Sequence, residues 1–90
     1  MVPIETVRMR FTGRFAPDSF AAFANRRAER LDLGLALETG NPSLFDVTVS
    51  GQPDLIDAFE MACSLGPMDC LVLDCERATL HSGYMENRNR

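Results

Sequence analysis

Several features that would assign a function directly are missing from this sequence of 90 residues. Cys63, Cys70 and Cys75 form an odd set without a C-x-x-C pair, which fits neither a disulfide framework nor a zinc knuckle. We interpret them as reduced thiols of the core. The single histidine, His81, has no ligand motif around it and is interpreted as a solvated side chain. We therefore expect no metal site and no cofactor.

The chain also lacks a positive charge excess and a long apolar run. Thirteen acidic against nine basic residues give a formal net charge of −4, so no overall field attracts nucleic acid or an anionic membrane. The apolar runs are far shorter than the roughly 20 residues of a transmembrane helix, and Met1–Arg10 lacks the apolar centre of a signal peptide. We expect a cytoplasmic protein without a nucleic-acid or membrane partner.

What the chain does contain is enough apolar material for one compact core. Hydrophobic residues make up 46% of it and charged residues 24%, which is ordinary for a globular protein. A chain this short cannot divide these residues between two cores. We predict a domain over residues 1–76 and a C-terminal tail over residues 77–90, because the segment after Glu76 has no clear period.

Apolar residues alternate along four segments, with the period of two that is typical of strands. These segments are Glu5–Thr12, Leu35–Thr39, Leu44–Ser50 and Cys70–Cys75. The turn signal Gly40–Ser43 joins the second and third into a hairpin. In the fourth segment both faces are apolar, so its register stays open.

Between these strands, apolar residues recur every three or four positions and predict two helices of about three turns. The first helix begins near Ser19, where Asp18 or Ser19 is suited to cap it, and it runs to Leu31. The second opens at Gly51–Asp54, with Pro53 at an early helical position, and stops at Leu65–Pro67.

The resulting order, β-α-β-β-α-β, predicts an α+β ferredoxin-like sandwich, in which a four-stranded antiparallel sheet carries two helices on one face. The other face of the sheet would look to solvent through Arg8, Arg10, Thr12, Asp46, Thr48 and Ser50. RNA-recognition domains share this order but stack bases on aromatic residues of the open face, whereas Phe11 and Phe45 here fall on the core side. Heavy-metal domains of this topology need a C-x-x-C, which the sequence lacks.

The segment from Gly13 into the first helix has the outline of an anion-binding turn. A strand ends and a helix begins there, so backbone N–H groups could converge on a phosphate. The candidate positions are Phe15, Ala16, Pro17, Asp18, Ser19 and Phe20, with Arg14 as an adjoining candidate.

From Val7 to Cys75 the chain resembles the acylphosphatases, single-domain enzymes of this fold that hydrolyse the mixed anhydride of a carboxylic acid and phosphate. In that family a glycine ends the first strand and is followed by Val-Gln-Gly-Val-x-Phe-Arg, where this chain has Phe15–Ala21. The family's helix carries an alanine and ends in Leu-Gly-Leu, which are Ala28 and Leu31-Asp32-Leu33 here. Further matches are Phe45, Val47, Val49 and Gly51 in an alternating strand, and Gly66-Pro67 before the last strand.

The resemblance also implies that the two catalytic side chains of the family are absent. The arginine that clamps the phosphoryl group corresponds to Ala21, and the asparagine that orients the attacking water corresponds to Thr39. Pro17 removes a backbone donor, and Asp18 adds a negative charge beside the turn. We therefore expect an acylphosphatase-like domain that is catalytically inactive and serves as a small binding or interaction module.

The alternative is an active acylphosphatase, or another small-anion hydrolase, that uses a relocated arginine. Arg14, Arg26 and Arg27 are the candidates for such a clamp, and Thr39 could still hydrogen-bond a water. The expected partner is a small anion or another protein, and the sequence leaves both a monomer and a homodimer open.

Overall fold

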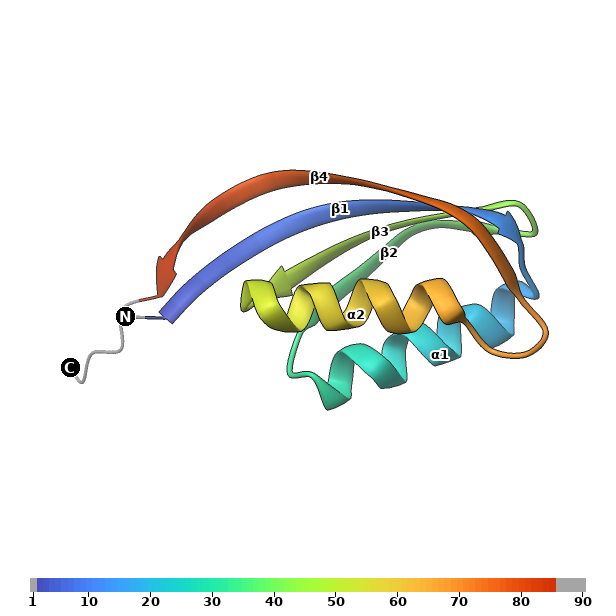
Figure 1. Ribbon diagram of the computed structural model, residues 1–90, viewed down its shortest axis with the longest axis horizontal. Helices are drawn as coiled ribbons and strands as arrows, with labels where there is room; N and C mark the ends of the chain where they lie inside the picture. Colours follow the sequence, from blue (N-terminus) through green and yellow to red (C-terminus); the bar gives the residue numbers. More distant parts are fainter. Residues whose placement is uncertain (1, 86–90) are drawn as a thin grey trace.

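The computed structural model describes residues 2–85, and the chain runs through six elements in the predicted order (Figure 1). The strands are β1 (Val2–Arg14), β2 (Gly34–Asn41), β3 (Leu44–Gly51) and β4 (Leu71–Met85). The helices are α1 (Pro17–Arg30) and α2 (Pro53–Leu65). The predicted ferredoxin-like α+β fold is confirmed.

The four strands form one antiparallel sheet in the order β2-β3-β1-β4, so that β2 and β4 are its edges. Both helices lie against one face of this sheet (Figure 1). Phe11 of β1 is directly opposite Phe45 of β3 and Cys75 of β4, which places all three on the same face. That face carries the core.

The core fills the space between the sheet and the two helices. Four phenylalanines pack at the end of the core nearest the β1–α1 turn, with ring centroids 4.7 to 5.7 Å apart in edge-on and tilted pairs: Phe11, Phe15, Phe20 and Phe45. The apolar stripes of the helices are buried as expected, through Phe20, Ala24 and Ala28 of α1 and Ile56, Phe59 and Cys63 of α2. Each large buried side chain contributes roughly 1.5–3 kcal/mol, so this cluster holds the turn firmly against the sheet.

The start of α1 differs from the prediction. The helix begins at Pro17, with Ala16 at the N-cap and no side chain capping it, so the expected capping by Asp18 or Ser19 is wrong. Proline suits the first helical position, because its fixed φ is already helical and its missing N–H is not needed there. The Ser19 hydroxyl instead donates to Asp69 Oδ1 at 2.9 Å. Strand β1 likewise continues past Gly13 to Arg14.

The predicted boundary after Glu76 is also wrong, because β4 continues to Met85 and pairs with β1 over this whole stretch. Two irregularities shift the register between β1 and β4, one near Leu73 and one near Leu80. They break the alternation by which a strand is recognised from sequence. In Figure 1 the beginning of β1 and the end of β4 extend beyond the helices. Because no helix covers this part of the sheet, its residues need not be apolar on either face. The rest of the predicted tail, residues 86–90, lies outside the described residues.

The face of the sheet opposite the helices is polar, as expected, with one correction. Asp46 was expected to look to solvent, but only 4% of it is exposed. Arg10 and Arg8 of the neighbouring strand cover it. In β4 the structure settles the register, since Val72 and Cys75 pack against the core and Leu71 and Leu73 are exposed. No helix within residues 2–85 has the length and apolar character to cross a membrane.

Candidate functional site

The β1–α1 turn consists of Phe15 and Ala16, between the last residue of β1 and the first of α1. The N–H of Phe15 donates to the carbonyl of Pro42 at 2.8 Å, and the N–H of Gly13 donates to the carbonyl of Ser43 at 3.2 Å. Both acceptors lie in the turn that joins β2 to β3. The hydrogen bonds therefore tie the two turns together and use the backbone donors on this side.

The next donor along the turn is used as well. The N–H of Ala16 donates to Cys70 Sγ at 3.4 Å, and the thiol lies 3.9 Å from the Ala16 carbonyl. Burial raises the pKa of the Cys70 thiol, so this group is protonated at neutral pH and can both accept from and donate to Ala16. From the sequence, Cys70 was predicted only as a thiol of the core and was not among the candidate site residues. Topology would have indicated it, because the start of the last strand lies beside the end of the first.

The remaining candidate positions differ in what they could offer a ligand. Phe15 and Phe20 have their side chains in the core, and Pro17 has no N–H. The N–H groups of Asp18 and Ser19 belong to the first turn of α1, where no intrahelical acceptor exists. They lie at the positive end of the helix dipole, but the exposed carboxylate of Asp18 already occupies that end.

Gly13 allows the turn to approach β4 closely. A Cβ atom at this position would lie 2.0 Å from the backbone carbonyl oxygen of Leu71. Because the clashing atom belongs to the backbone, no side-chain rotation could relieve the clash. The register between β1 and β4 shifts at this point, between Thr12 and Gly13. The glycine is therefore required by strand packing, whether or not a ligand binds.

Ala21 and Thr39, which the resemblance matches to the family's catalytic positions, lie in different layers. Ala21 is on α1, half-buried and packed against the core. Thr39 is exposed on the edge strand β2, opposite Asp46 and next to a register shift between Leu37 and Thr39. By this register Thr39 shares the sheet face of Asp46, which is the face away from the helices.

The arginines considered as substitute clamps are spread over the molecule. Arg14 is exposed at the end of β1, next to the turn. Arg26 is exposed on α1, and Arg27 lies over the ring of Phe23 at 5.4 Å from its centroid. Both are nine or more residues after Pro17, which places them about 13 Å or more along the helix axis from its start. Only Arg14 adjoins the turn.

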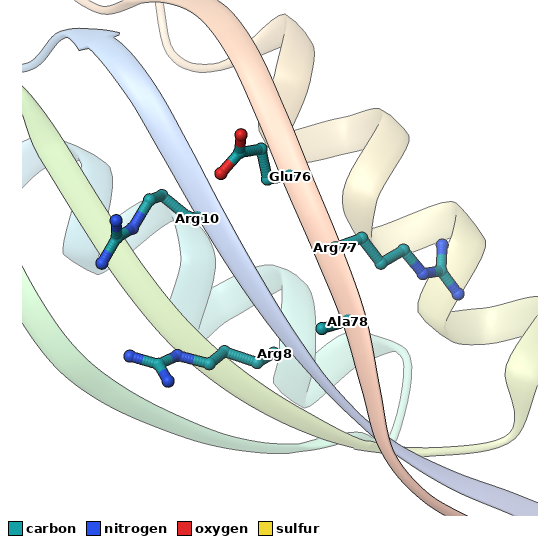
Figure 2. A pocket seen from close by; sticks show the side chains of 5 residues that line it. All are labelled: Arg8, Arg10, Glu76, Arg77 and Ala78. Atoms are coloured by element: carbon teal, nitrogen blue, oxygen red, sulfur yellow. The ribbon is translucent and has the colours of Figure 1, made fainter.

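A second polar site lies on the open face of the sheet (Figure 2), in a depression of about 390 Å³. Arg8, Arg10, Glu76, Arg77 and Ala78 line it. Figure 2 shows Arg8 and Arg10 extending across β3, whereas Arg77 extends toward α2. There Arg77 pairs with Asp57 at 2.8 Å and Glu60 at 2.7 Å.

The cations of this depression are already neutralised within the chain. Arg10 donates to both oxygens of Asp46, at 2.8 and 3.0 Å, and Arg8 lies 3.8 Å from the same carboxylate. The hydrogen bond from Arg10 holds the pKa of Asp46 below its usual range. Arg8, Arg10, Asp46 and Glu76 together carry no net charge, so this face has little attraction for an anion.

The three cysteines form no disulfide, and none has the lowered pKa that is typical of a reactive thiol. Burial raises the pKa of Cys63 and of Cys75 to about 12, so both are thiols at neutral pH. Within residues 2–85, no cluster of three His, Cys, Asp or Glu side chains is arranged to hold a metal ion.

Comparison with solved structures supports the predicted resemblance at the level of the fold. The chain superposes on an acylphosphatase from Bacillus subtilis with a TM-score of 0.77 and 17% identity, covering 97% of this chain and 93% of that one. It superposes on an acylphosphatase from Coxiella burnetii with a TM-score of 0.73 and 16% identity, covering 91% and 86%. Neither the protein-family models nor the curated proteins gave a match. The chain thus has the fold of the acylphosphatases.

Proposed function

We propose that this protein is a non-catalytic module with the acylphosphatase fold, which binds a partner and does not hydrolyse acyl phosphates. One observation carries the proposal: the N–H groups of Phe15 and Ala16 already donate to Pro42 and Cys70. A phosphate at the turn would have to break these bonds before it could form its own. Breaking a buried hydrogen bond costs about 1–3 kcal/mol for each group left unpaired.

The charges of the turn support the same conclusion. Phosphoryl transfer depends on positioning and charge stabilisation, and an arginine at the transferred group contributes on the order of a thousandfold or more in rate. Ala21 can contribute none of this. At about 5 Å and an effective dielectric constant of about 20, the carboxylate of Asp18 would repel each unit of phosphate charge by roughly 3 kcal/mol.

The first test measures hydrolysis and anion binding on the full chain. We expect hydrolysis of benzoyl phosphate at the rate of buffer alone. In an NMR titration with inorganic phosphate, we expect no shift at millimolar concentration for the amides of Ala16 and Asp18–Ala21. Turnover that is abolished by Arg14→Ala would contradict the proposal and favour the relocated arginine, since Arg14 is the one candidate that adjoins the turn.

The second test tries to restore catalysis. Ala21→Arg with Thr39→Asn introduces the family's two side chains but leaves Pro17 and Asp18 in place. We expect no turnover from this double variant. Adding Pro17→Gly and Asp18→Asn to the double variant removes the proline and the repelling charge. We expect turnover only in this quadruple variant, at least about tenfold above that of the double variant. A double variant that already turns over would show that the turn is competent as it stands.

A further inference from the structure

The faces of α1 and α2 that point away from the sheet form a shallow groove. The two helices lie side by side beneath the sheet (Figure 1). A depression of about 450 Å³ runs between them, lined by Phe23 and Arg27 of α1 and by Ala58, Met61, Ala62 and Leu65 of α2. We call it the α1–α2 groove.

The α2 side of the α1–α2 groove is apolar and open. Met61 is 69% exposed and Leu65 is 80% exposed, one turn apart on the same face of the helix. An amphipathic helix normally carries polar residues on the face away from its sheet. Neighbouring exposed apolar side chains beside a hollow are typical of a surface that binds another protein.

The α1 side is basic. Phe23 and Arg27 are shared with a second depression of about 130 Å³, which Arg26 and Arg30 complete. At 100° per residue these four side chains cover an arc of about 100° on α1, and Glu29 falls about 60° outside it. No carboxylate lines either depression. We call Arg26, Arg27 and Arg30 the α1 arginine cluster.

The α1 arginine cluster differs from three of the four other arginines within residues 2–85, since only Arg14 is likewise without a carboxylate at ion-pair distance. Arg8, Arg10 and Arg77 each lie within ion-pair distance of a carboxylate. Within residues 2–85, none of the three cluster members makes an ion pair. A chain of net charge −4 thus concentrates three unpaired positive charges beside its exposed apolar groove.

We propose that the α1–α2 groove and the α1 arginine cluster together bind an amphipathic acidic helix of a partner protein. Its apolar side chains lie over Met61 and Leu65, and its carboxylates accept hydrogen bonds from the α1 arginine cluster. Helix-in-groove binding uses this combination of apolar anchors and flanking charges, and guanidinium groups match carboxylates in two-point geometry. This inference rests on the proposed function, because it names the partner of the binding module.

A peptide is favoured over an anionic membrane for an electrostatic reason. Charges are screened beyond about 8 Å at physiological ionic strength, so a bound helix would feel mainly the arginines that it contacts. A membrane presents negative charge over a plane wider than the protein, and the net charge of −4 would oppose its approach. The groove is also concave, which suits a helix better than a flat bilayer surface.

The test uses the full chain, isotopically labelled, and a synthetic helix of about five turns with leucines on one face and glutamates along its edge. Two control peptides replace the glutamates by glutamine or the leucines by serine. We expect amide shifts confined to Phe23–Arg30 and Ala58–Leu65, with affinity at least tenfold weaker for either control peptide. Arg26→Gln with Arg30→Gln, and separately Met61→Ser with Leu65→Ser, should each weaken binding tenfold or more.

The matched charge control is Arg8→Gln with Arg14→Gln, which removes two positive charges from other faces and should leave peptide affinity within twofold. No shift at millimolar peptide would overturn the proposal. Binding to phosphatidylserine vesicles without peptide binding would contradict the proposal and show that the surface binds membranes. A concentration-dependent dimer that protects the α1–α2 groove would also contradict it and show that the groove binds a second copy of this chain. Absence of hydrolysis together with absence of peptide binding would refute this inference alone, whereas hydrolysis with peptide binding would refute the proposed function alone.

Discussion

Arg10 and Asp46 face each other directly across the central strand pair β1–β3, and the guanidinium of Arg10 donates to both carboxylate oxygens of Asp46. The two bonds are 2.8 and 3.0 Å long, and Asp46 is 4% exposed. The guanidinium of Arg10 thus shields the carboxylate of Asp46 from solvent on the face of the sheet that no helix covers. A buried carboxylate with bidentate geometry contributes more than an exposed ion pair does.

Asp46→Asn is expected to lower the free energy of unfolding at pH 7 by about 1–3 kcal/mol, because Arg10 loses a charged acceptor. The hydrogen bond from Arg10 lowers the pKa of Asp46 in the folded state. The stabilisation is therefore present above the ordinary carboxyl pKa and is lost as the pH falls through the lowered one. In urea unfolding, the difference between the two proteins should begin to shrink below about pH 4 and should close only at a pH below the lowered pKa of Asp46. Asp74→Asn, which changes an exposed carboxylate on β4, serves as the control and should unfold like the unmodified protein at pH 7.

Gly13→Ala is expected to destabilise the fold by about 1–3 kcal/mol, the cost of forcing an extra methyl group into a packed site. The new Cβ would lie 2.0 Å from the backbone oxygen of Leu71, so β1 and β4 would have to separate at their register shift. Gly34→Ala is the matched control, because its Cβ would meet Ser50 only at 3.8 Å. Thermal unfolding measures both variants. Equal melting temperatures for the two would show that the close approach at Gly13 is not required.

Hydrogen exchange tests whether residues 77–85 belong to the cooperative fold. We expect the amides of Arg77–Met85 that donate to β1 to be protected, since this stretch pairs with Val2–Met9. The other amides of this stretch, which point away from β1, should exchange quickly because β4 is an edge strand. Uniformly fast exchange after Glu76 would restore the tail that the sequence predicted.

Thiol reactivity tests the burial of the cysteines. The pKa of Cys63 and of Cys75 is raised to about 12, mainly by burial, so their thiolate fraction near pH 8 is very small. Alkylation by iodoacetamide should be at least about a hundredfold slower in the native protein than in urea, where thiols titrate near pH 8.5. The native rate should keep rising up to pH 10. A rate that levels off near pH 8.5 would mean that these thiols are solvated.

Much of the fold could be predicted because burial on one side of an element leaves a period in the sequence. The alternation of Phe45, Val47 and Val49 and the helical spacing of Phe20, Ala24 and Ala28 identified a strand and a helix, and the structure buries all six side chains. The second half of β4 could not be predicted in this way. It is held by backbone pairing with β1 and by the ion pairs of Arg77, neither of which requires alternating apolar residues.

The candidate site was predicted only as a position on the chain. Turn residues and the start of a helix are local signals, and they located the connection between β1 and α1, which the structure limits to Phe15 and Ala16 because α1 already begins at Pro17. Whether its N–H groups were available depended on acceptors far away in the sequence. Ala16 and Cys70, for example, are separated by 54 residues and meet only when the sheet forms.

The sequence by itself therefore determined the order of elements, the core-facing residues and the position of the β1–α1 turn, because these follow from local periodicity and turn chemistry. The tertiary structure decided that the donors of this turn are used within the chain, that Asp46 is buried beneath Arg10, and that Met61 and Leu65 lie beside the α1 arginine cluster. Each of these features depends on contacts between segments that are distant in the sequence, and such contacts leave no periodic pattern in the local sequence.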